Sequence, residues 1–134
     1  MTATTQDRNT PMKDGSLIVV PVAAGQKIPA GALVAASATG FATNGATATT
    51  LAYLGRAEVL ADNTAGADGA ISMTIRRGKA FKWANESGDP ITQASVGRAC
   101  YIVDNQTVAK TNGTNTRSQA GTVLGVDVDG VWVI

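Results

Sequence analysis

The clearest pattern along the chain is a strict alternation of apolar and polar residues over two neighbouring segments, 71–76 and 80–84. Such alternation is typical of strands with one buried and one exposed face. In the second segment it places Phe81 and Trp83 on one face. Residues 77–79, Arg-Gly-Lys, look like a turn, so the two segments together predict a β-hairpin.

Further short apolar runs, separated by turn residues, predict the remaining strands. The first is 17–22, where Pro21 lacks an N–H and therefore indicates an edge strand or a bulge. A two-residue Asp129-Gly130 loop predicts a final hairpin in which Val128 and Val131 are neighbours across the turn. The other expected elements are strands within 51–60, 100–103, 122–128 and 131–134, and loops at 62–69 and 111–119.

One short helix is expected after the central strands. Asp89 is a capping carboxylate followed by Pro90, a residue that favours the first helical position. Residues 91–96 then predict a turn or two of helix, and Gly97 predicts its end. The many short strands, with turns about every ten residues, therefore predict a mainly β domain, a small sandwich or barrel-like fold.

The first 15 residues differ from the rest of the chain. They are polar, contain Pro11 and show neither helical nor strand periodicity. We expect a flexible N-terminal arm at 1–15 that becomes ordered against a neighbouring molecule, with a disordered tail as the alternative. Residues 16–134 contain no linker and predict a single β-rich domain. The candidate contact residues of the arm are Thr4, Arg8 and Pro11.

Composition narrows the range of partners. Hydrophobic residues make up 44% of the chain, charged residues 16% and aromatic residues 4%, and the net charge is +1. The near-neutral charge does not favour nucleic acid as a partner. A core built from small side chains often gains stability from self-association. No apolar run is long enough to cross a membrane, and no signal peptide precedes the first strand, so we expect synthesis in a cytoplasm without membrane attachment.

The sequence offers little catalytic chemistry. It contains no histidine and one cysteine, which removes Ser-His-Asp and Cys-His arrangements and a structural zinc site. Cys100 lies in an apolar run and is interpreted as a buried side chain. Most of the ten acidic residues lie beside Gly, Asn or Pro, where turn roles account for them. We therefore expect a protein that is not an enzyme, with no catalytic residue, cofactor or metal; a hydrolase with paired carboxylates, such as Asp127 and Asp129, is the weakest alternative.

Two features are candidate partner contacts. The first is the basic cluster of Arg76, Arg77, Lys79 and Lys82, beside the two aromatic residues of the second alternating segment. It is either a contact surface, for an acidic protein or for nucleic acid that stacks on the aromatics, or a solvated turn with core-facing aromatics. The solvated turn is favoured, and among the contacts the near-neutral net charge favours an acidic protein. The second candidate is Trp132, which alternates with valines. It faces either outward, as an interface residue, or into a core.

Several segments resemble the capsid cement (decoration) proteins of tailed bacteriophages. The resemblance covers roughly residues 17–134 and is carried mostly by turns and apolar strands. One of the stretches that carry it is Arg-Arg-Gly-Lys-Ala-Phe-Lys-Trp-Ala at 76–84. The others are 28–34, 89–92, 96–97, 100–109 and 120–133.

This resemblance implies a β-rich, β-tulip-like fold and a homotrimer on the surface of an icosahedral head. It implies that the protein binds the major capsid protein and clamps neighbouring subunits against internal pressure, and that it resides in the virion. No catalytic residues come with it. Another virion surface component, such as a fibre-like or carbohydrate-binding module, is the alternative function.

Overall fold

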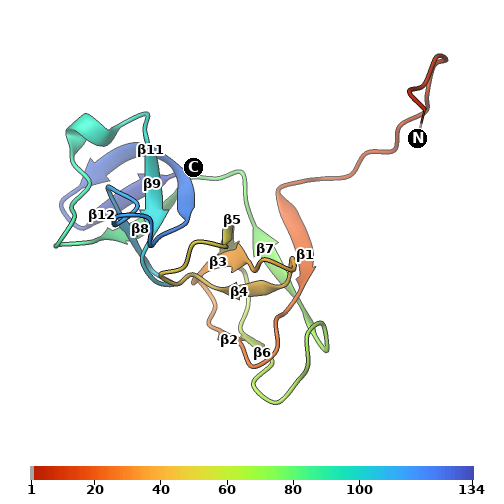
Figure 1. The fold of residues 1–134 in the computed structure, drawn as a ribbon, viewed down its shortest axis with the longest axis horizontal. Helices are drawn as coiled ribbons and strands as arrows, with labels where there is room; N and C mark the ends of the chain where they lie inside the picture. The colour runs from red at the N-terminus through yellow and green to blue at the C-terminus, as the bar shows by residue number, and fades with distance from the viewer. Residues whose placement is uncertain (1) are drawn as a thin grey trace.

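The computed structural model describes residues 2–134 as twelve short strands and a single 3-10 turn (Figure 1). The strands are β1 (Leu17–Pro21), β2 (Lys27–Ile28), β3 (Leu33–Ala36), β4 (Ala42–Asn44), β5 (Ala52–Ala57), β6 (Ala61–Asp62), β7 (Ser72–Arg76), β8 (Phe81–Asn85), β9 (Ala99–Ile102), β10 (Thr107–Ala109), β11 (Gln119–Asp127) and β12 (Gly130–Val133). The 3-10 turn is η1 (Gln93–Ser95). The expectation of a small, mainly β, barrel-like domain with one short helical element is confirmed.

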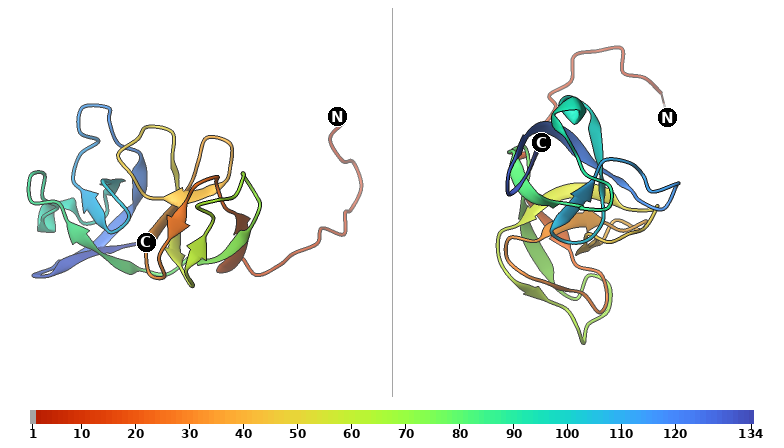
Figure 2. Two further views of the ribbon diagram at one scale, coloured as in Figure 1. Left: turned by 90° about the horizontal axis from the view of Figure 1, so that it is seen from below. Right: turned by 90° about the vertical axis from the view of Figure 1, so that its left-hand side faces the viewer.

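The strands form two main units that follow one another along the chain (Figure 2). The first is a five-stranded sheet in the order β1-β7-β5-β3-β4, with a small β2-β6 ladder beside it. The second is a closed barrel in the order β10-β8-β12-β11-β9, in which only the β10–β8 pair is parallel. A closed barrel has no free strand edge, whereas the five-stranded sheet keeps β1 at its edge.

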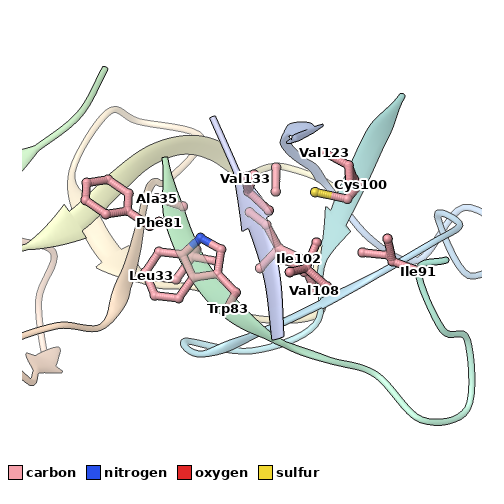
Figure 3. Close-up of a cluster of buried hydrophobic side chains, with 12 residues drawn as sticks. Leu33, Ala35, Phe81, Trp83, Ile91, Cys100, Ile102, Val108, Val123 and Val133 are labelled. Atoms are coloured by element: carbon pink, nitrogen blue, oxygen red, sulfur yellow. The ribbon is translucent and has the colours of Figure 1, made fainter. Parts of the chain in front are cut away.

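The two units are joined because β3 is buried on both faces. Successive side chains of a strand point to opposite sides, and here Leu33 and Ala35 pack into the barrel core while Val34 packs into the sheet core. Figure 3 shows Leu33 and Ala35 beside the aromatic rings of the barrel. The barrel cluster consists of Leu33, Ala35, Phe81, Trp83, Ile91, Cys100, Ile102, Val108, Ala120, Val123, Val131 and Val133.

A hydrogen bond reinforces the same junction. The indole Nε1 of Trp83, in β8 of the barrel, donates to the Tyr53 hydroxyl of β5 at 3.2 Å. Burial raises the pKa of Tyr53 to about 12, so this hydroxyl stays protonated. The sheet cluster on the other face consists of Val22, Ile28, Ala32, Val34, Ala42, Ala57, Ala61, Met73 and Ile75.

The predicted hairpin of 71–76 with 80–84 is wrong. Both segments are strands, but β7 pairs with β1 and β5, whereas β8 pairs with β12 and β10. Residues 77–79 therefore form a crossing from the sheet to the barrel, where Gly78 adopts a φ of 73°. Alternation identifies a half-buried strand, but it carries no information about the strand beside it.

The final hairpin is present with its turn one residue earlier than predicted. Asp127 pairs with Gly130, so the loop is Val128-Asp129 and Val126 pairs with Val131. Gly130 belongs to the strand because β8 lies very close to it. A Cβ on Gly130 would lie 2.8 Å from the carbonyl oxygen of Trp83.

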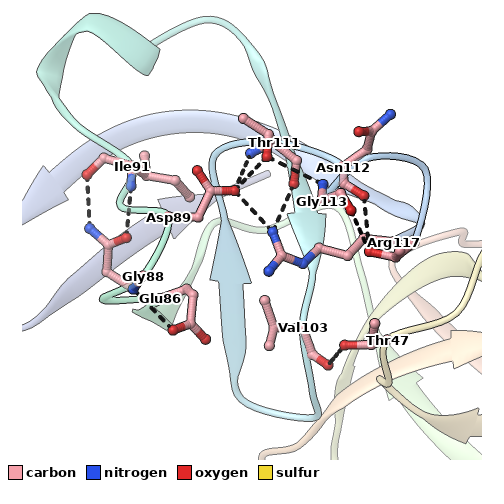
Figure 4. Close-up of polar contacts among 12 residues, drawn as sticks. Thr47, Glu86, Gly88, Asp89, Ile91, Val103, Thr111, Asn112, Gly113 and Arg117 are labelled. Carbon is pink, nitrogen blue, oxygen red and sulfur yellow. Dashed lines mark hydrogen bonds and ion pairs between the residues drawn. The ribbon is translucent and has the colours of Figure 1, made fainter.

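The predicted helix is reduced to η1, and Asp89 does not cap it. Thr92 is the N-cap residue instead. The Asp89 carboxylate accepts hydrogen bonds from the Thr111 backbone N–H at 3.0 Å and the Thr111 hydroxyl at 2.6 Å, and it forms an ion pair with Arg117 at 2.9 Å (Figure 4). These contacts hold the pKa of Asp89 below its usual range, the Thr111 hydroxyl being the largest cause. Asp89 therefore fastens the 111–117 loop to the barrel.

Candidate protein-contact surfaces

The predicted basic cluster does not form one surface. Arg76 lies on the sheet, where its Nε contacts Glu58 Oε1 at 2.9 Å. The same carboxylate oxygen binds Arg56 at 2.7 Å. Hydrogen bonds from Arg56 and then Arg76 lower the pKa of Glu58. Arg76 is therefore held in an ion-pair network within the sheet and is not free to meet a partner.

Lys82 lies on the barrel instead. Its Nζ contacts both carboxylate oxygens of Asp129, at 3.0 and 2.9 Å, and this hydrogen bond lowers the pKa of Asp129. The ammonium also lies 5.5 Å from the centre of the Trp132 ring. The positive charge of Lys82 is therefore compensated within the hairpin of β11 and β12.

Trp132 faces outward, as one of its two interpretations expects, and its role as an interface residue stays a prediction. It is 38% exposed between the buried Val131 and Val133. Its indole Nε1 donates to Asp127 Oδ2 at 2.7 Å, which fixes the ring on the barrel surface. By contrast, the aromatic rings of the second alternating segment are buried, Phe81 at 8% and Trp83 at 5% exposure. Those two rings are core residues and are not available for stacking.

Arg77 and Lys79 form the part of the basic cluster that stays exposed. Neither forms an ion pair within residues 2–134. They flank a pocket of about 270 Å³ at the crossing from sheet to barrel, whose apolar wall includes Leu54, Phe81 and Ile134. We call this the junction pocket. Two cations that form no ion pair, beside an apolar hollow, suit an acidic protein surface.

The N-terminal arm extends away from the rest of the molecule (Figures 1 and 2). Residues 2–14 form no strand or helix, and all of their side chains are exposed. The side-chain hydrogen bonds of residues 2–13 remain inside the arm, such as Thr4 to Gln6 and Arg8 to Thr10. The candidates Thr4, Arg8 and Pro11 are thus accessible.

The strand that follows the arm presents a free edge. In its ladder with β7, Val22 N–H donates to Ile71 and Ser16 accepts from Arg77 N–H. Since hydrogen-bonded residues alternate along an antiparallel pair, the even-numbered residues face β7. The backbone N–H and C=O groups of Leu17 and Val19 therefore point away from the sheet.

Two apolar side chains accompany these free backbone groups. Leu17 is 41% exposed and Val19 is 69% exposed. The edge position of β1 was predicted from Pro21 and is confirmed. The exposure of Leu17 and Val19 was not predicted, because the uninterrupted apolar run 17–20 does not indicate which residues face solvent.

Within residues 2–134, no group of three or more His, Cys, Asp or Glu side chains is placed to hold a metal ion. In the same part of the chain, no helix has the length and apolar character needed to cross a bilayer. Cys100, the single cysteine, is buried as expected. No protein-family model, curated protein or solved structure matches this chain.

Proposed function

We propose that this protein is a viral capsid decoration, or cement, protein that binds the outer surface of a phage head. There it stabilises contacts between subunits of the major capsid protein. The observation that carries this proposal is the continuity of two binding elements. A 13-residue exposed arm runs directly into β1, an edge strand with free backbone groups and exposed Leu17 and Val19.

The physical basis is strand addition. An extended segment of a capsid subunit can pair with the β1 edge, where main-chain hydrogen bonds give affinity and Leu17 and Val19 give apolar contact. The arm continues from the same edge and can pass over a neighbouring subunit. Ordering the arm costs about 1–2 kcal/mol per residue in backbone entropy, so it must bury side chains as it binds.

Self-association as a homotrimer fits the same role. Several large apolar side chains are exposed, including Val19, Leu124 and Val128. A trimer carries three arms, so binding of one arm raises the effective concentration of the other two at the head surface. Sedimentation equilibrium of the full chain should therefore give three times the chain mass, and a monomer at all concentrations would remove this part of the proposal.

Binding to heads tests the proposal directly. Heads assembled without this protein are mixed with the full chain, with a deletion of residues 2–14, or with Val19→Lys. We expect both changes to weaken cosedimentation at least tenfold. The matched control is Val59→Lys, because Val59 is 54% exposed outside β1. Equal binding by all four proteins would reject the arm and the edge as contacts.

A second candidate function is a carbohydrate-binding module on the virion surface. The specific observation that favours it is Trp132, an exposed ring held in place by Asp127 and flanked by Lys82. Aromatic rings fixed on a surface provide an apolar platform for ligands. A glycan array that shows binding by the natural chain and none by Trp132→Ala would support this function. An array without binding, together with copurification on heads, would reject it.

A further inference from the structure

A hollow on the barrel shares no lining residue with the contact surfaces described above. It is a groove of about 450 Å³ between η1, the start of β9 and the segment that leaves β10. Its lining includes the small side chains of Ala94 and Ala99 and the longer side chains of Arg98, Tyr101 and Lys110. We call this the η1 groove.

The charge of the η1 groove is not compensated. Arg98 and Lys110 form no ion pair within residues 2–134, and the side chains of Arg98, Lys110 and Tyr101 donate no hydrogen bond in that part of the chain. The carboxylate of Asp89 contacts Thr111 on the groove wall. It does not cancel the two positive charges, because it is already paired with Arg117. Two cations and a phenol therefore converge on one apolar hollow.

We propose that the η1 groove binds an acidic segment of a protein partner. Carboxylates of the segment pair with Arg98 and Lys110, and a small apolar side chain between them lies on Ala94 and Ala99. The volume is within the 300–1,000 Å³ range of typical binding sites. Nucleic acid suits the groove less well, because binding of a phosphate backbone generally needs more than two cations.

The η1 groove lies where it could help the protein bridge two capsid subunits. Figures 1 and 2 place η1 and the arm at opposite ends of the molecule. A chain that binds one subunit through the arm and another through the η1 groove would bridge the two. The bridging role rests on the proposed decoration function, whereas binding of an acidic segment by the groove does not.

A peptide titration tests the groove without any capsid. The probe is a synthetic peptide of alternating glutamate and alanine, added to the isotope-labelled full chain and followed by amide NMR shifts. We expect saturable shifts at residues around 94–101 and 110–111, and weaker binding as salt is raised. Arg98→Gln with Lys110→Gln should weaken binding at least fivefold. The control pair Lys13→Gln with Lys27→Gln removes the same charge at two exposed positions outside the groove and should leave binding unchanged.

The remaining outcomes each overturn the inference. Equal binding of a glutamine–alanine peptide would show that carboxylates are not recognised. Equal weakening by both charge-removing pairs would show a general effect of net charge. Tighter binding of a single-stranded oligonucleotide at the same residues would replace the protein segment with nucleic acid. Should the double variant fail to fold, Tyr101→Phe serves as a second variant of the groove. It removes only a hydroxyl group and keeps the ring, and its NMR spectrum shows whether it is folded.

Discussion

Gly55 of β5 lies directly against the carbonyl oxygen of Arg76 in β7, so close that no Cβ fits between them. The φ of Gly55 is 142°, in the region that favours glycine. The register between β3 and β5 shifts at this place, where Val34 pairs with Gly55 and Ala35 pairs with Tyr53. The bulge leaves Leu54 without a partner on β3, and Leu54 and Gly55 both line the junction pocket.

Gly55→Ala should therefore destabilise the fold strongly. The added methyl group meets backbone rather than a flexible side chain, and the backbone of alanine is strained at this φ. Together these effects should lower the free energy of unfolding by about 2–4 kcal/mol in urea titrations. Gly125→Ala is the matched control, because nothing lies within 4 Å of its Cβ position. Equal stability of the two variants would contradict the close packing of β5 on β7.

The shared strand β3 predicts that the two cores unfold together. Leu33→Ala creates a cavity in the barrel cluster and Ile75→Ala creates one in the sheet cluster, and each should cost about 2–5 kcal/mol. Since both tryptophans, Trp83 and Trp132, lie on barrel strands, tryptophan fluorescence reports on the barrel. It should follow the same transition as circular dichroism in both variants. The exposed Val59→Ala should change little. Separate transitions in Ile75→Ala would show that sheet and barrel are independent units.

Local patterns in the sequence account for the strands but not for their partners. The alternation at 71–76 and 80–84 identified β7 and β8, because a half-buried strand needs only its own residues to show its period. The pairing of β8 with β12 brings together residues about fifty positions apart. A turn at 77–79 fits a hairpin and a crossing equally well, so the sequence could not exclude the hairpin.

The candidate contacts likewise divide into those that local sequence patterns indicate and those that depend on distant segments. The period of its strand allowed the outward position of Trp132 but left a position in the core open. The dispersal of the basic cluster could not be foreseen, because the carboxylates that bind Arg76 and Lys82 come from Glu58 and Asp129 in distant segments. The η1 groove left no sequence signal at all. Arg98 and Lys110 come together only through the pairing of β9 with β10.

Removing the Asp89 carboxylate should loosen the 111–117 loop. Asp89→Asn keeps the shape but loses the charge that accepts from Thr111 and pairs with Arg117, an arginine whose side chain is only 17% exposed. Breaking hydrogen bonds to a charged, half-buried group should cost about 1–3 kcal/mol of unfolding free energy. Amide hydrogen exchange at 111–117 should rise as well. Asp129→Asn, on an exposed ion pair, should leave both measurements close to those of the natural chain.

Stability should be flat around neutral pH and should fall in acid. Contacts with Arg56 and Arg76 lower the pKa of Glu58 from its ordinary 4.5, and Thr111 and Arg117 lower that of Asp89 from 3.8. A carboxyl group whose pKa is lowered by folding stabilises the folded state. This stabilisation is fully present at pH values above the ordinary pKa and is lost as the pH falls through the pKa of the folded state. The chain has no histidine to titrate between pH 5 and 8.

Thermal unfolding midpoints from pH 8 to pH 2 check this profile. The midpoint should stay nearly constant down to about pH 5 and decrease below it. Glu58→Gln should show a shallower decrease, because the variant has no carboxylate to protonate at the Arg56–Arg76 network. A marked change between pH 6 and 8 would contradict the profile, since no group in the described ion pairs titrates there.

The buried thiol of Cys100 should be unreactive in the folded protein. It is fully buried in the barrel cluster, and its Sγ lies 3.4 Å from the Gly121 carbonyl oxygen. Burial raises the pKa of Cys100 from 9.0 to about 11, so the reactive thiolate is scarce at pH 8. Labelling with DTNB at pH 8 should therefore proceed at the rate of global unfolding and accelerate in urea as the unfolded population grows.

The same shift predicts a loss of stability in alkali. The unfolded thiol ionises near pH 9, whereas the folded thiol ionises near 11. The contribution of the protonated thiol to the free energy of unfolding is therefore fully present below pH 9. It is lost as the pH rises through 11, which lowers the free energy of unfolding by about 3 kcal/mol. Cys100→Ala removes this titration and keeps that of Tyr53, whose pKa is also raised by burial. Urea unfolding at pH 9 and pH 11 should show a smaller loss for Cys100→Ala than for the natural chain, and equal losses would exclude a buried, protonated thiol.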